Sequence, residues 1–297
     1  MLATVERFGL ILLGDFVGMF ILIFIGDGAV ITSTVFKGYD LFGVAIVWFI
    51  AVTLAIYAAG AISGAHFNPA ITMSFAAFYD FRWRLVPAFI ITQIAGAFAA
   101  AAVLYALFSG TIKHFEAMHH IVRGHPGSQM SAFMFTTFSP NPGLLGVGKV
   151  YFAQVSHVQW FAAEAVSTLL LIFCILFLID QRNEARPNPS FVPVIIGLLV
   201  GGLVAIEAPL TMTALNPARD LGPRLFTLVA GWGGIAFPAP RHGWWIPSVA
   251  TVFGGLVGAA LYRYGYSRAF IVAAPPGREP AEIQEASEAD AAPGMEG

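Results

Sequence analysis

The triplet Asn-Pro-Ala occurs twice in this chain, as Asn68-Pro69-Ala70 and as Asn216-Pro217-Ala218. Asparagine is a favoured N-cap, and proline suits the first helical position because its missing N–H would have no intrahelical partner there anyway. Each triplet therefore predicts the start of a helix. One such start would be an ordinary helix cap, but two starts in matching places of two apolar halves form a specific signature.

The elements around these triplets are predicted to lie in lipid. Of the 297 residues, 58% are hydrophobic and only 11% are charged, and the mean hydropathy is +0.76. A soluble domain, which is about one quarter charged, could not bury so much apolar surface. The net charge of -2 provides no basic face, so we expect no nucleic-acid partner. The composition predicts an all-α membrane protein surrounded by a lipid bilayer.

Six apolar segments are long enough to cross a bilayer. They lie at about 8–34, 41–62, 85–108, 158–180, 191–208 and 244–263. Two shorter segments, 68–79 and 216–228, begin at the triplets and are too short to cross. The short loops 80–84 and 181–187 each carry two arginines, which places these loops and both chain ends in the cytoplasm by the positive-inside rule.

The order of the segments indicates an internal repeat. Asp15 precedes the first triplet by nearly the same distance as Glu164 precedes the second, and each half contains three crossing segments. Because three is odd, the second half must enter the membrane from the opposite side. We expect one domain at 1–270, with halves at about 8–108 and 158–265, and a disordered acidic cytoplasmic tail at 271–297.

Opposed entry would bring the two helix starts together near the middle of the bilayer. Each start carries about half a positive charge, so the junction would repel cations, while Asn68 and Asn216 could donate hydrogen bonds to a passing oxygen. We expect the segments 63–67 and 210–214 to descend as extended backbone, which is tolerated at that depth where it lines a wet cavity. The carbonyls expected along the pore are those of Gly64, Ala65, His66, Met212, Thr213 and Ala214.

At these residues the chain resembles the major intrinsic proteins, the aquaporin and aquaglyceroporin family, and is most similar to bacterial glycerol uptake facilitators. The resemblance covers roughly residues 8–265. It rests on the segments 63–70, 119–124 and 214–224. It implies six tilted helices and two re-entrant half-helices, a homotetramer with a pore in every subunit, and a location in the plasma (inner) membrane.

The resemblance maps the family's narrow selectivity filter to Trp48, Val204, Thr213 and Arg219. Trp48 would supply an apolar wall and Arg219 fixed donors, which suits a polyol. Glycerol facilitators have Gly and Phe at the positions of Val204 and Thr213, and water-selective members have His in place of Val204. We expect glycerol and water to pass. The alternative is a mainly water-conducting aquaporin.

Several ionisable residues leave alternatives open. Arg219 could instead serve as a structural ion-pair partner. Asp220, in the first turn of the second half-helix, is expected to be structural and to orient Arg219 or Arg224. Asp15 and Glu164 are expected to hydrogen-bond the loop of their own half. Glu207 could be a charge in the outer vestibule or the partner of an arginine.

The competing functions are a coupled secondary transporter, in which buried carboxylates could carry protons, and an intramembrane enzyme. The spans contain no nucleophile–base pair and no cluster of metal ligands, so we expect no enzyme, no cofactor and no metal. The adjacent His119 and His120 have no matching further ligands and are expected to belong to a loop. The sequence predicts a passive channel for small uncharged solutes.

Overall fold

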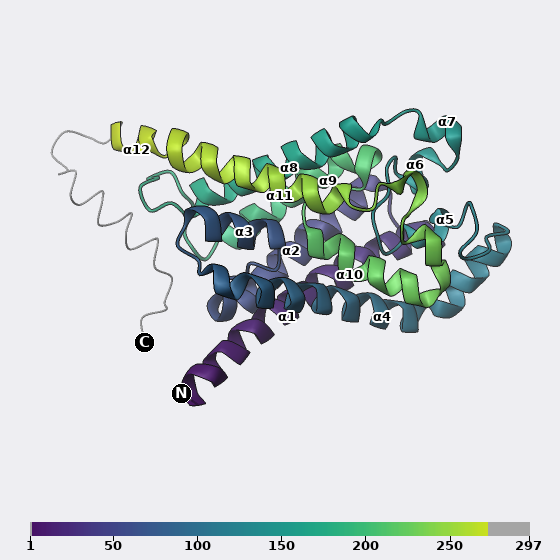
Figure 1. Ribbon diagram of the computed structural model, residues 1–297, viewed down its shortest axis with the longest axis horizontal. Helices are drawn as coiled ribbons and strands as arrows, with labels where there is room; N and C mark the ends of the chain where they lie inside the picture. The colour runs from purple at the N-terminus through teal and green to yellow at the C-terminus, as the bar shows by residue number, and fades with distance from the viewer. Residues whose placement is uncertain (1, 273–297) are drawn as a thin grey trace.

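The computed structural model describes residues 2–272, and all regular elements in that range are helical. Within this described range, six helices are long and apolar enough to cross a membrane, which confirms the predicted architecture. They are α1 (Leu2–Phe36), α2 (Leu41–Ser63), α4 (Val86–Met118), α8 (His157–Ile179), α9 (Val192–Thr211) and α11 (Ile246–Leu261). Figure 1 shows these helices running roughly side by side along the long axis of the molecule.

The shorter helices occupy the interior and the two ends. Two of them, α3 (Pro69–Phe78) and α10 (Pro217–Thr227), begin at the Asn-Pro-Ala triplets. α3 lies toward the end of the bundle that carries α12 (Arg268–Val272), and α10 lies toward the other end (Figure 1). The remaining ones, α5 (Gln129–Ala132), α6 (Pro142–Leu145) and α7 (Lys149–Phe152), are single turns in the long connection between α4 and α8.

Three helix boundaries differ by three residues or more from the ranges read from hydropathy. α1 begins at Leu2, α4 continues past 108 to Met118, and α9 continues past 208 to Thr211. Hydropathy marks where the apolar surface ends, but a helix continues until a residue interrupts its hydrogen bonds, and 109–118 contains no proline. The expectation that 63–67 and 210–214 are extended is therefore wrong for Ser63, Leu210 and Thr211, which are helical. It is also wrong for residues whose positive φ angles are left-handed, namely Gly64, Ala65, Phe67, Met212 and Thr213. The predicted tail lies outside the described residues from 273 onward, and 271–272 belong to α12.

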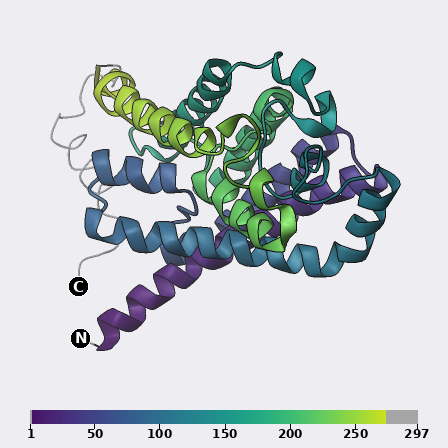
Figure 2. The same cartoon turned by 45° about the vertical axis from the view of Figure 1, so that its right-hand side comes forward.

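Small residues bring the long helices close together. A Cβ atom on Gly197 of α9 would lie 2.6 Å from the carbonyl oxygen of Phe49 in α2. A Cβ atom on Gly258 of α11 would lie 2.5 Å from the carbonyl oxygen of Leu169 in α8. Helices in lipid associate through such close packing because apolar burial gives little advantage there. The tightly packed pairs leave the interior of the bundle to α10 and the loops around it (Figure 2).

Candidate functional site

The two half-helices meet at their N-terminal caps. The side-chain oxygen of Asn68 accepts from the backbone N–H of Ala70 at 2.9 Å, and that of Asn216 accepts from Ala218 at 2.9 Å. The amide nitrogen of Asn68 donates to the carbonyl of Leu215 at 2.9 Å, and the amide nitrogen of Asn216 donates to the carbonyl of Phe67 at 2.8 Å. Each cap is thus tied to the loop that leads into the other cap.

The two entering loops have the same backbone conformation. Counting back from each asparagine, the first, third and fourth residues all have positive φ. These are Phe67 (21°), Ala65 (54°) and Gly64 (79°) in the first loop, and Leu215 (55°), Thr213 (54°) and Met212 (63°) in the second. Only glycine adopts this region without strain, so five of the six residues cost of order 1 kcal/mol each or more. The bonds that anchor the loops must offset this strain.

Asp15 anchors the first loop from α1. Its carboxylate accepts hydrogen bonds from the hydroxyl of Ser63 at 2.8 Å and from the backbone N–H of Phe67 at 3.2 Å. The side-chain amide of Gln93 in α4 donates to the same carboxylate at 2.7 Å. Asp15 is fully buried. It therefore joins α1, α2 and α4 to the loop of its own half.

Glu164 anchors the second loop from α8. Its carboxylate accepts from the backbone N–H groups of Ala214, at 2.9 and 3.1 Å, and of Leu215, at 3.1 Å. Glu207 of α9 lies close enough to interact electrostatically with Glu164, and it accepts from the hydroxyl of Thr211 at 2.9 Å. Glu207 is buried, so it is not a vestibule charge, and no described arginine lies within ion-pair distance of it.

The four residues mapped to the selectivity filter are all buried in the interior. The guanidinium carbon of Arg219 lies 4.8 Å from the centre of the Trp48 ring, and Trp48 and Val204 belong to one apolar cluster. The hydroxyl of Thr213 is buried and has no hydrogen-bond partner among the described residues. The donors of Arg219, the face of Trp48 and this hydroxyl are the polar and aromatic groups that a solute could contact.

The long connection between α4 and α8 contributes residues that the sequence did not indicate. The carbonyl of Phe135 accepts from Arg219 at 3.5 Å. The carboxylate of Asp220 accepts from the hydroxyls of Thr136 and Thr137, both at 2.7 Å, and from the backbone N–H of Thr137 at 2.9 Å. Asp220 thus clamps this segment onto α10 beside the filter.

The contacts of Asp220 also decide whether it orients Arg219 or Arg224, which the sequence left open. Its carboxylate forms an ion pair at 2.8 Å with Arg224, one turn along α10, and both side chains are fully buried. Arg219 pairs with a different residue, Asp27 of α1, at 3.4 Å. Asp27 was not identified from the sequence, although a carboxylate inside an otherwise apolar span is a signal that could have found it.

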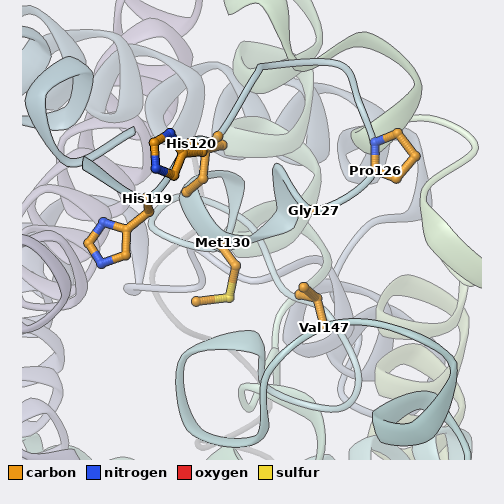
Figure 3. Close-up of a pocket in the computed structure, with 7 residues that line it drawn as sticks. His119, His120, Pro126, Gly127, Met130 and Val147 are labelled. Carbon is orange, nitrogen blue, oxygen red and sulfur yellow. The ribbon is translucent and has the colours of Figure 1, made fainter. Parts of the chain in front are cut away.

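A separate hollow of about 270 Å³ lies in the connection between α4 and α8. Figure 3 shows His119 and His120 at its edge, with Pro126, Gly127, Met130 and Val147 around it. None of its lining residues belongs to the loops that enter at the half-helices. Within residues 2–272, no three His, Cys, Asp or Glu side chains are grouped so that they could hold a metal ion.

Six crossing helices enclosing two half-helices that meet cap to cap define a multi-pass membrane channel. The chain belongs to the major intrinsic protein family, whose model matches residues 4–262. Channel function, rather than an enzymatic reaction, follows from this membership.

Several relatives cover most of the chain. It is 39% identical over 254 residues to the glycerol uptake facilitator protein of Escherichia coli, covering 84% of this chain and 86% of that protein. It is 38% identical over 276 residues to the glycerol uptake facilitator protein of Pseudomonas aeruginosa, covering 92% and 94%. A propanediol uptake facilitator of Salmonella typhimurium is 38% identical over 253 residues, covering 84% and 91%.

A solved structure has the same fold. The X-ray structure of the aquaglyceroporin from Plasmodium falciparum matches with a TM-score of 0.76 and 26% sequence identity. The match covers 90% of this chain and 100% of that one.

Proposed function

We propose that this protein is a passive channel that lets glycerol, other small uncharged solutes and water cross the plasma membrane. The observation that carries the proposal is the reciprocal pair of bonds in which Asn68 and Asn216 each reach the loop of the other half. The second N–H of the Asn68 amide is left available to a solute oxygen. The Asn216 amide also contacts the sulfur of Met19 at 3.9 Å, a weak acceptor that a solute oxygen would replace. The relatives named as glycerol and propanediol uptake facilitators support the solute class.

Exclusion of ions is proposed to begin at this junction. The N-termini of α3 and α10 face each other, and each carries about half a positive charge, so a cation meets repulsion from both. A neutral hydroxyl can accept from either asparagine instead. A water or hydroxyl held by both donors directs its own hydrogens outward, which interrupts a chain of proton transfer.

The filter is proposed to consist of Trp48, Val204, Thr213 and Arg219. Trp48 and Val204 would contact the carbon edge of a polyol, while Arg219 and the hydroxyl of Thr213 would bind its hydroxyl edge. Further weak acceptors are proposed to come from loop carbonyls. These are the carbonyls of Gly64, Ala65, His66, Met212, Thr213 and Ala214. Weak and repeated binding permits fast flux, since no single site retains the solute.

We propose that both chain ends lie in the cytoplasm. Arg263 near the end of α11 lies over the ring of Tyr79, 5.4 Å from its centre, which supports a common face for that helix end and the arginine-containing loop at 80–84. The hydroxyl of Tyr262 donates to the carboxylate of Asp180 at 2.6 Å, which supports a place on the same face for the second arginine-containing loop, at 181–187. Fusion of a reporter to the C-terminus and protease digestion of sealed vesicles would test this orientation.

We also propose that the protein is a homotetramer with one pore per subunit, as the family resemblance implies. The long helices carry large apolar side chains on their outside, and we expect these side chains to be buried against lipid or neighbouring subunits. They include Leu107, Ile206 and Phe253. The mass of the detergent-solubilised protein, measured by light scattering with the detergent contribution subtracted, tests the assembly, and a monomer would overturn it.

The channel function is tested with purified protein in liposomes. Stopped-flow light scattering compares the permeabilities to water, glycerol and urea with those of protein-free liposomes. We expect glycerol permeability well above the protein-free value, linear in solute concentration through the millimolar range and independent of proton or sodium gradients. Saturation at low millimolar glycerol together with gradient dependence would indicate a coupled transporter instead.

A further inference from the structure

Arg219, the one basic residue of the proposed filter, is paired with a carboxylate from a different helix. The side chain of Asp27 in α1 is 1% exposed, and its Oδ1 lies 3.4 Å from Nη2 of Arg219. Neither carboxylate oxygen of Asp27 accepts a hydrogen bond within the described part of the chain. Asp220 is near enough to add electrostatic repulsion. The charge of Asp27 is therefore compensated by Arg219 rather than by a network of hydrogen bonds.

Asp27 belongs to the wall of the constriction. The residue before it, Gly26, packs directly against the Trp48 ring, since an added Cβ atom would lie 2.6 Å from that ring. The same ring lies beside the guanidinium of Arg219 at 4.8 Å. Asp27, Trp48 and Arg219 thus form one contiguous group at the level of the filter.

The net charge of this region depends on Asp27. Two ion pairs lie next to each other here, Asp27 with Arg219 at 3.4 Å and Asp220 with Arg224 at 2.8 Å. Their four charges sum to zero. Without Asp27 the remaining three would carry one positive charge. Asp27 therefore largely cancels the repulsion of cations by Arg219. The cation repulsion that remains comes from the N-termini of the two half-helices.

We propose that Asp27 is a specificity-determining residue of the constriction, which neutralises Arg219 and sets the charge selectivity of the channel. The proposal deepens the channel function proposed above and rests on it. Its main consequence is that removing Asp27 leaves the charge of Arg219 unbalanced and gives the constriction one positive charge. A small anion should then enter more easily, although the half-helix N-termini are unchanged.

Four proteins test this proposal: wild type, Asp27→Val, Arg219→Val and the double variant. Nitrate entry into liposomes is followed with an internal anion-sensitive dye. We expect Asp27→Val to pass nitrate about tenfold faster or more than the double variant, because an unpaired guanidinium a few ångströms from an anion attracts it strongly away from bulk water. Equal nitrate rates in Asp27→Val and the double variant would overturn the proposal.

A second measurement covers the case in which the double variant does not fold. Asp27→Val leaves one positive charge, so its nitrate permeability should exceed that of wild type by about tenfold, by the same Coulomb argument. Equal nitrate rates would also contradict the proposal. Asp40→Asn is the matched control, since it removes an exposed carboxylate and keeps a side chain that can cap α2. It should retain wild-type ion exclusion.

Glycerol flux through the wild type separates the two proposals. If wild-type liposomes pass glycerol but the ion rates do not depend on Asp27, the charge proposal fails and the channel function stands. If wild-type liposomes pass no glycerol, the channel function fails whatever the order of the ion rates. Size-exclusion profiles of all variants establish that each protein is folded before its rates are compared.

Discussion

Replacement of Asp220 by alanine should destabilise the protein strongly. The Asp220 carboxylate accepts hydrogen bonds from Thr136, Thr137 and Arg224. Asp220→Ala removes this acceptor and leaves the guanidinium of Arg224, which is fully buried, without its counter-charge. Removing one partner of a buried ion pair costs about 3–5 kcal/mol, so we expect a loss of that size in the free energy of unfolding.

Two companion variants separate charge from shape. Asp220→Asn keeps the size of the side chain and one acceptor oxygen but removes the charge, so its loss should be smaller than that of Asp220→Ala. Asp220→Leu combined with Arg224→Met replaces the pair by apolar groups. It should lose less than Asp220→Ala, because no buried charge is left unpaired.

The assay is reversible unfolding of the protein in detergent micelles with increasing denaturant, followed by tryptophan fluorescence. The midpoints and slopes give the free energies of the four proteins. A loss below about 1 kcal/mol for Asp220→Ala, the size found for exposed pairs, would refute the assignment of Asp220 as the clamp of the connection between α4 and α8. A double variant less stable than Asp220→Ala would refute the unpaired-charge explanation.

Three other perturbations have defined outcomes. Thr213→Phe adds an aromatic wall to the proposed filter and should raise the glycerol-to-water permeability ratio in stopped-flow measurements; an unchanged ratio would remove Thr213 from the filter. Asp15→Ala removes the acceptor of the Phe67 N–H and should lower glycerol flux per folded protein, whereas wild-type flux would show that the first loop needs no anchor. Burial alone would raise the pKa of Asp180, but hydrogen bonds from Arg182 and Tyr262 hold that pKa below its usual 3.8. The folded state therefore binds this proton less readily than the unfolded state, so Asp180 stabilises the fold at neutral pH and its contribution disappears as the pH falls through the depressed pKa. Asp180→Asn should accordingly be less stable than wild type at pH 7 and equally stable in acid, and a pH-independent difference would contradict this.

The parts of the fold that the sequence predicted are those governed by local rules. An asparagine followed by proline favours the start of a helix, and the two half-helices begin in this way at Pro69 and Pro217. Long apolar runs must span lipid, and six such helices are present among residues 2–272. The end of α4 was misjudged because hydropathy reports lipid contact and not helix continuation.

The connection between α4 and α8 could not be predicted in the same way. Residues 131–142 are buried, yet they include Ser131, Thr136, Thr137, Ser139 and Asn141. Polar residues in a long loop read as solvent-exposed when only the sequence is considered. Their burial depends on partners far along the chain, such as Asp220 for the two threonines, and no local pattern encodes such pairs.

The charged residues of the interior show the same limit. Arg219 was assigned to the filter from the motif that contains it, while its partner Asp27 lies in a different helix and in no motif. Glu207 and Glu164 lie on neighbouring helices and interact, but their sequence positions do not indicate it. Contacts between helices are set by how the helices rotate and pack, which is decided by the whole bundle.

The exchange of amide bonds between the two halves has a consequence for how such a chain could arise. Each half offers one asparagine donor and one loop carbonyl, and it receives the same two groups from the other half. A contact of this kind is self-complementary, like the interface of a symmetric dimer. Two separate copies of a single half could therefore satisfy each other, so the pairing does not require both halves to be joined in one polypeptide.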